Sequence, residues 1–257
     1  MKITTLVLLC CLSVVLTKCS SDESLKKESN STYMASKETV DNNLDGIVVI
    51  GNKTWMRKNL SVTRFRNGDL IPHVVNPSQW ESITQAAWCY PNENAANNAV
   101  YGKIYNWYAV ADPRGLAPVG WHVATDADWT ELLTYVSNNG GNWDGTSGLP
   151  LNGNKVAKAL ASKSYWNTIF PTGTTFFGQI GINANLNNLT GFSALPAVSR
   201  ESGGSFWYTI GDAGYWWTST AYNGNSAWYR NMSYNYMPLS RSFEDKNAGY
   251  SVRCVKD

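Results

Sequence analysis

The sequence has few histidines, no clear surplus of charge and no long hydrophobic run. Only His73 and His122 occur in 257 residues, so few side chains can fill the metal-ligand and general-base roles of histidine in many enzymes. The 21 basic and 19 acidic residues nearly balance. This disfavours a nucleic-acid binder, which normally needs a basic surplus to neutralise phosphates. Aromatic residues are instead abundant, at 13% of the chain, and favour a secreted binding or structural module.

The longest apolar run lies near the N-terminus, from Leu6 to Leu16, and is too short to span a bilayer comfortably. It follows Lys2 and precedes Cys19, and this order predicts a signal peptide over residues 1–18. The residues before Cys19 resemble a bacterial lipoprotein cleavage site, after which Cys19 would be lipidated. A plain signal peptide cut elsewhere is the alternative. The predicted localisation is therefore the cell envelope, as an outer-membrane lipoprotein. The sequence leaves open whether the domain is exposed at the cell surface.

Residues 19–43 are predicted to form a flexible tether behind the lipidated cysteine. They are mostly Ser, Lys, Glu, Asn and Thr with almost no large apolar side chain, so they cannot bury enough surface to fold. A tether of this length reaches roughly 25–30 Å. Hydrophobic patterning begins at Leu44, and residues 44–257 are predicted to form one folded domain.

After an N-terminal hairpin signal, the folded part shows helix signals first and strand signals later. Gly51-Asn52 is a turn signal between two apolar runs and predicts a β-hairpin over residues 44–62. Helical spacing and good helix formers predict three helices, over residues 99–110, 126–136 and 153–162. Thr125 is the expected N-cap of the second helix. Turn signals every eight to twelve residues predict short antiparallel strands, the clearest over residues 214–220, 227–236 and 249–255. This order predicts an α+β fold.

The strand predicted over residues 227–236 carries the candidate ligand site. Strict alternation places Trp228 on one face and Tyr229 on the other. Flat aromatic rings beside amides suit sugar recognition, because a ring stacks on C–H groups while amides bond the hydroxyls. The predicted ligand-binding residues are Trp228, Tyr229, Asn231, Asn235, Asn223 and Asn225. A solvated strand of ordinary β-forming residues is the alternative.

After cleavage, Cys89 and Cys254 are the cysteines of the domain. In an oxidising compartment they could form a disulfide. Two buried free thiols are the alternative, and the sequence leaves both open. A catalytic cysteine is less expected, because neither residue has a histidine near it in sequence.

His122 precedes the Thr125 cap and is predicted to be a hydrogen-bonded structural residue at a strand-to-helix corner, because no carboxylate or cysteine pair stands at metal-ligand spacing around it. Oxygen donors at residues 91–94 and 142–144 would suit calcium. Both stretches also read as Asn-rich turns. No cofactor is predicted, and calcium is left as an option without support.

Six stretches in order resemble a known family, the Fibrobacter succinogenes major paralogous domain of secreted bacterial proteins. They read IGNKTWM, YGKIYNW, GLAPVGWHVATD, GFSALP, GYWWTST and SVRCVKD. The resemblance covers roughly residues 45–257 and implies a C-type-lectin-like fold, with two to three helices packed on short twisted antiparallel sheets with long loops. It implies no known activity. Many relatives carry a cysteine where Ala117 stands, so Cys89 is the only partner left in the domain for Cys254.

The sequence therefore predicts a lipid-anchored envelope domain that binds rather than catalyses. A glycan or a surface protein is the expected partner, and nucleic acid is not. The alternative is a structural or adhesion-assembly component of the envelope without a small-molecule ligand. A redox or modifying enzyme is the third option; the resemblance extends to formylglycine-generating enzymes, but fold analogy alone does not carry a chemistry.

Overall fold

The computed structural model describes residues 46–148, 153–170 and 177–257. The predicted signal peptide of residues 1–18, the predicted lipidation site Cys19 and the predicted tether of residues 19–43 lie outside the described residues. The described residues belong to one compact unit, Leu44–Asp257. Within them, every helix is too short or too polar to cross a membrane.

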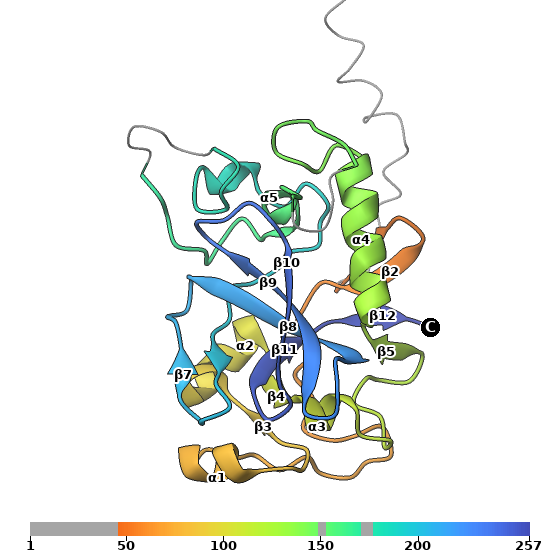
Figure 1. The fold of residues 1–257 in the computed structure, drawn as a ribbon, viewed down its shortest axis with the longest axis vertical. Coiled ribbons are helices and arrows are strands. Elements are labelled where there is room, and N and C mark those ends of the chain that lie inside the picture. Colours follow the sequence, from red (N-terminus) through yellow and green to blue (C-terminus); the bar gives the residue numbers. More distant parts are fainter. Residues whose placement is uncertain (1–45, 149–152, 171–176) are drawn as a thin grey trace, which may run out of the picture. The chain divides into compact units, whose positions relative to one another are not determined.

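Two sheets form the body of this unit (Figure 1). The smaller sheet has four strands in the order β1-β2-β12-β5, formed by β1 (Ile47–Ile50), β2 (Lys53–Met56), β5 (Trp121–Val123) and β12 (Cys254–Lys256). It therefore pairs the first strands of the unit with the last strand, since Val255 of β12 pairs with Trp55 of β2.

The larger sheet has eight strands, with the main order β10-β9-β8-β11-β4-β3, while β6 pairs with β11 and β7 pairs with β6. Its strands are β3 (Trp88–Cys89), β4 (Ile104–Asn106), β6 (Ser199–Arg200), β7 (Phe206–Trp207), β8 (Ala213–Ala221), β9 (Ser226–Ser233), β10 (Ser240–Asp245) and β11 (Gly249–Val252). The long neighbours β8, β9 and β10 are antiparallel. In contrast, β11 runs parallel to β8.

Among the described residues, one helix is long: α4 (Asp126–Asn138, 13 residues). The Thr125 side chain accepts from the Asp128 N–H, and the Asp128 side chain accepts from the Thr125 N–H, which satisfies two backbone donors of the first turn. The other helices are α1 (Pro77–Ser82), α2 (Asn98–Tyr101), α3 (Trp107–Val110), α5 (Ala157–Leu160), and the 3-10 helices η1 (Pro91–Glu93), η2 (Ala95–Asn97) and η3 (Ala184–Leu186).

The predicted α+β, C-type-lectin-like fold is wrong, because the described chain is dominated by its two sheets. The helix predicted over residues 99–110 ends after one turn at Gly102, which has φ of +71°, and the chain then enters β4 before α3 begins. A Cβ at Gly102 would lie 2.8 Å from the Leu60 carbonyl oxygen. The helix predicted over residues 153–162 is one short turn, α5.

Other predicted elements are confirmed. The hairpin near Gly51-Asn52 is β1–β2, and Thr125 caps α4. Strands occupy residues 214–220, most of 227–236, and 249–255. The last of these divides at Arg253 into β11 and β12, which belong to different sheets.

Neighbouring tryptophans of β8 bury themselves in two different apolar clusters. Trp216 packs with Trp55 and Trp129 in one cluster, while Trp217 packs with Tyr250 and Cys254 in another. Both indoles are fully buried. The eight-stranded sheet therefore has a packed cluster on each face of β8, as side-chain alternation requires.

Candidate ligand-binding site

A cavity of about 310 Å³ opens on the Tyr229 face of the eight-stranded sheet. Tyr215 of β8, Tyr229 of β9, Glu244 of β10 and Tyr250 of β11 line it. Tyr229 pairs with Trp217 of β8 and with Ser242 of β10. Tyr215 and Glu244 each lie two residues from one of these partners. They therefore share the face of Tyr229, because strand residues two apart project to the same side. Ligand pockets begin at about 300 Å³, so this cavity is large enough for one small group.

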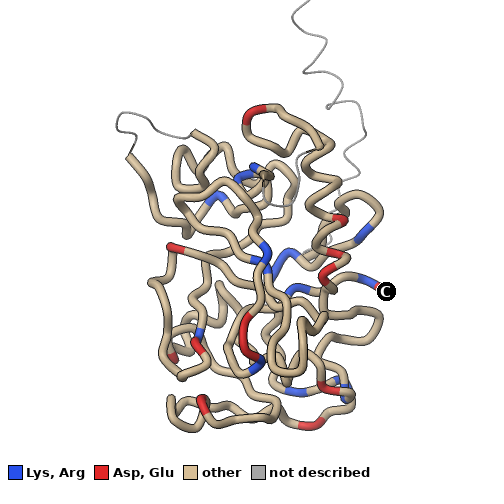
Figure 2. The backbone as a smooth tube through the Cα atoms, viewed as in Figure 1, with Lys and Arg blue, Asp and Glu red and all other residues tan. Residues whose placement is uncertain are grey.

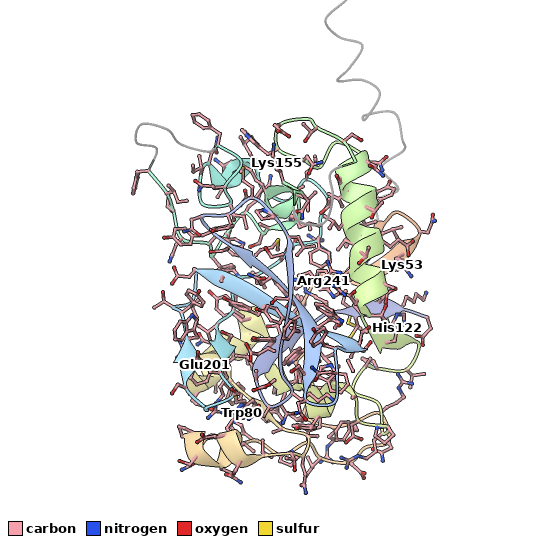
Figure 3. All side chains as sticks on the ribbon, viewed as in Figure 1. Lys53, Trp80, His122, Lys155, Glu201 and Arg241 are labelled. Atoms are coloured by element: carbon pink, nitrogen blue, oxygen red, sulfur yellow. The ribbon has the colours of Figure 1, made fainter. Side chains whose placement is uncertain are left out.

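The β6–β7 hairpin forms the rim of the cavity. It contributes Glu201 and Trp207, and Glu201 lies beside β7 in Figure 3. Gly204 has φ of +85°, and a Cβ there would lie 2.3 Å from the Pro77 carbonyl oxygen. Only glycine therefore allows the hairpin to approach α1 this closely.

The rim aromatics Trp207 and Tyr208 are exposed, and Tyr208 has an uncommon backbone conformation. Trp207 is 50% exposed and Tyr208 is 53% exposed. Tyr208 has φ of +67°, a left-handed conformation that is uncommon for a bulky residue and costs on the order of 1–3 kcal/mol. In this conformation its ring stacks on Tyr215, with ring centroids 6.1 Å apart. Such strain is concentrated at functional sites.

The tyrosines of the wall pack closely. Ring centroids of Tyr215 and Tyr250 lie 5.3 Å apart, and those of Tyr229 and Tyr250 lie 4.9 Å apart. Burial and the negative charge of Glu244 raise the pKa values of both Tyr229 and Tyr250. Their phenols therefore stay protonated and can donate hydrogen bonds at neutral pH.

The Tyr250 hydroxyl has no hydrogen-bond partner in the part of the chain that the structure describes. The residue is only 5% exposed, and among the described residues no hydrogen bond to its hydroxyl is found. The Tyr250 hydroxyl is also not among the fully enclosed, unsatisfied polar atoms, so it reaches the space that the residue lines. Buried polar groups normally have partners, so this hydroxyl is available to a ligand.

Along the described chain, Lys and Arg are interleaved with Asp and Glu (Figure 2). The cavity, in contrast, has a net negative charge. Glu201 and Glu244 nevertheless form no ion pair with any described residue, although other carboxylates do. Arg200 also lines the cavity, but its buried guanidinium donates to Glu93 Oε1, at 2.7 Å, and to three backbone carbonyls. Its charge is thus already matched.

The six predicted ligand-binding residues do not form one site. Tyr229 lines the cavity, but Trp228 lies on the opposite face of β9, where the Arg241 guanidinium sits 3.3 Å from its ring centroid. Asn231 is half-buried and pairs with Tyr215 and Ser240 in the sheet.

The three other predicted amides lie outside β9. Asn223 and Asn225 belong to the β8–β9 turn, where Asn223 Oδ1 accepts from the Asn225 and Ser226 N–H groups. Asn235 follows the end of β9, and its Oδ1 accepts from the Ser233 hydroxyl. Only Tyr229 of the six thus lines the cavity.

Sequence reasoning missed most of the cavity. Tyr215 lies in the GYWWTST stretch that indicated the family and no site, and it is half-buried. Trp207 and Tyr208 belong, with Phe206, to a run of three aromatics after a Gly- and Ser-rich stretch, and this run is a usable signal. Glu244 and Tyr250 carried no local signal, since only the strand order brings them beside Tyr229.

Cys89 and Cys254 are both free and both buried, which is the second of the two alternatives that the sequence left open. Cys89 packs with Trp80 and Ile104, whereas Cys254 packs in the cluster that contains Trp217. Burial raises the pKa of each thiol to about 12. Neither thiol is therefore ionised at neutral pH, which makes both poor nucleophiles.

His122 is a hydrogen-bonded residue at the β5–α4 corner, as predicted. Its Nδ1 lies 2.8 Å from Asp257 Oδ1 and its Nε2 lies 3.2 Å from Asp128 Oδ2. Figure 3 shows His122 and Lys53 near the N-terminal end of α4, and Lys53 Nζ lies 2.8 Å from Asp128 Oδ1.

The stretches considered for calcium are engaged by protein donors. Glu93 binds Arg200, Asp144 binds Lys155 and Thr146, and Asn142 Oδ1 accepts from the Lys155 N–H. In the part of the chain that the structure describes, no three His, Cys, Asp or Glu residues are grouped to hold a metal ion.

Comparison with known proteins gives a family and no close relative. The sequence model of the Fibrobacter succinogenes major domain matches residues 48–256, a span that begins in β1 and ends in β12. No curated protein and no solved structure matches the chain significantly.

Proposed function

The chain belongs to the Fibrobacter succinogenes major domain family, and we propose that it is a non-catalytic binding module of the cell envelope that holds a carbohydrate in the tyrosine cavity. The single observation that carries this proposal is the Tyr250 hydroxyl, which is buried on the cavity wall without a hydrogen-bond partner among the described residues.

The chemistry of the wall supports a sugar. Hydroxyl-bearing residues surround the cavity, namely Ser199, Ser202, Tyr208, Tyr215, Tyr229 and Tyr250. The aromatic faces can stack on the C–H groups of a sugar ring, while protonated phenols and serine hydroxyls bond its hydroxyls. A volume of about 310 Å³ suits a single ring better than a protein segment, which needs an interface on the order of 800 Å² per partner.

Binding without catalysis is supported by the groups that a reaction would need. The thiols of Cys89 and Cys254 are buried and protonated, and His122 is held between two carboxylates. None of these residues lines the cavity. The placement in the envelope rests on the N-terminal pattern that ends at Cys19.

The test is a glycan-array screen of the purified full-length protein, followed by titration of the best ligand into Tyr250→Phe. This change removes the hydroxyl and keeps the ring, so we expect about a tenfold loss of affinity, as for one neutral hydrogen bond. Tyr236→Phe is the matched control, because Tyr236 is exposed and outside the cavity.

A second pair of variants separates the two faces of β9. Tyr229→Ala should abolish binding, while Trp228→Ala should leave it unchanged. The reverse result would move recognition to the Trp228 face. If the folded protein bound no glycan on the array, this result would contradict carbohydrate binding. It would favour a surface-protein partner or a structural envelope component.

A further inference from the structure

Two carboxylates that form no ion pair with any described residue line the tyrosine cavity together with the Tyr250 phenol. Glu201 comes from the β6–β7 loop and Glu244 from β10, and both line the cavity. The negative charges of both residues contribute to the raised pKa of Tyr250, after the larger effect of burial. Both carboxylates are therefore close enough to Tyr250 for their charges to act on it.

We propose that the ligand of this cavity is an amino sugar, whose protonated amine is bound by Glu201 and Glu244. This assignment rests on the proposed carbohydrate-binding function and names its ligand class. The sugar ring lies against the tyrosine wall, and its hydroxyls meet the hydroxyl groups of the cavity, including that of Tyr250.

Among the described residues that line the cavity, no cation is free to pair with these carboxylates, which argues for a charged ligand. A neutral sugar that closed the cavity would remove water from two carboxylates and leave them without a counter-charge, which is costly. Arg200 cannot supply this charge, because Glu93 and three carbonyls already engage its guanidinium. An ammonium group offers three donors for carboxylates and is also attracted to aromatic faces.

The hydroxyls of the cavity favour an amino sugar over a lysine side chain. A lysine side chain has an apolar stem and one polar group, so it would leave most of the cavity hydroxyls without partners. A pyranose presents a hydroxyl on most of its carbons. Calcium is a poor fit, because it takes six to eight oxygen ligands, and the cavity offers two carboxylates.

The experiment is isothermal titration of the full-length protein with three matched trisaccharides: β-1,4-linked glucosamine, its N-acetylated form, and β-1,4-linked glucose. The glucosamine trimer should bind about 10- to 100-fold more tightly than the other two, as expected for one charge-assisted contact. Raising the pH to deprotonate the amine should remove this preference. The acetylated trimer should show no such pH dependence.

The variant that tests the two carboxylates is Glu201→Gln/Glu244→Gln, which keeps their shape and removes their charge. It should reduce binding of the glucosamine trimer by about 10- to 100-fold and leave the acetylated trimer unchanged. Asp245→Asn is the matched control, because Asp245 is the exposed neighbour of Glu244 on β10 and does not line the cavity.

The outcomes separate this inference from the proposed function. Equal affinity for all three trimers, or a double variant that still prefers the amine, would overturn the amino-sugar assignment and leave carbohydrate binding intact. A lysine peptide that bound as tightly as the glucosamine trimer would overturn it in favour of a protein ligand. Binding of none of the sugars, here and on the array, would overturn both proposals.

Discussion

The two faces of β9 differ in whether their charged side chains form ion pairs. The face with Arg230 is called the paired face below, and the face with Tyr229 is called the cavity face. On one face, the fully buried Arg230 donates to Asp126 Oδ1 at 2.7 Å and to the Thr130 hydroxyl, and Asp126 also binds Arg241. On the other face, Tyr229 shares a cavity with Glu201 and Glu244, which have no ion pair among the described residues. The first arrangement fixes α4 to the sheet, while the second leaves charge unmatched. We infer that one face serves stability and the other serves binding.

The paired face ties the start of α4 to three strands. Asp126 and Asp128 lie in its first turn, where negative charge suits the helix dipole. Asp126 meets Arg230 of β9 and Arg241 of β10, while Asp128 meets Lys53 of β2. Figure 3 shows Lys53 and Arg241 on either side of this helix end. The ion pairs therefore connect both sheets to one helix terminus.

The largest expected effect comes from breaking the paired face. Asp126→Ala should lower the free energy of unfolding by about 3–5 kcal/mol, because it leaves the buried Arg230 without its counter-charge. Two other guanidinium nitrogens of Arg230, Nε and Nη1, already lack hydrogen-bond partners among the described residues. Urea denaturation followed by tryptophan fluorescence measures this loss.

The matched control is Arg230→Met, which removes the buried charge and leaves Asp126 with Arg241. It should cost less than Asp126→Ala. If both variants lowered the free energy of unfolding equally, the effect would come from loss of the ion pair and not from leaving the Arg230 charge without a partner.

A smaller loss of stability is expected at low pH, when Asp128 becomes protonated. Burial alone would raise the pKa of Asp128, but hydrogen bonds from Lys53 and Thr125 outweigh it and hold this pKa at about 2, below the ordinary value of about 3.9. The resulting stabilisation is fully present above about pH 4 and is lost as the pH falls towards 2. It amounts to about 2 kcal/mol.

Urea denaturation at pH 5, 3 and 2 measures this loss. Asp128→Asn should flatten the dependence on pH in this range, while Glu201→Gln should keep the wild-type slope. An unchanged slope in Asp128→Asn would show that other carboxylates carry the acid sensitivity.

The smallest effect on stability belongs to the cavity face. Glu201→Gln/Glu244→Gln should change the free energy of unfolding by no more than about 0.5 kcal/mol, as is usual for surface positions without partners. Urea denaturation at neutral pH measures it. A loss above about 1 kcal/mol would mean that these carboxylates support the fold, and the contrast between the two faces would fail.

Local signals predicted local structure well. The Gly51-Asn52 turn, the Thr125 cap and the alternation along β9 each depend on a few adjacent residues, and each is confirmed. The helix over residues 99–110 failed for a tertiary reason. Gly102 packs against the Leu60 and Asn59 carbonyls with a positive φ, and residues 104–106 gain more by pairing with β3 and β11.

The sequence by itself determined the family, the position of the main helix and the alternating faces of β9, because each follows from short motifs or from side-chain periodicity. Only the tertiary structure decided which face of β9 opens onto a cavity. Trp228 is covered by Arg241 from β10, while Tyr229 opens onto a cavity whose other walls come from β8, β10, β11 and the β6–β7 hairpin. Such a site depends on strand order and register, which bring together residues that no local pattern connects.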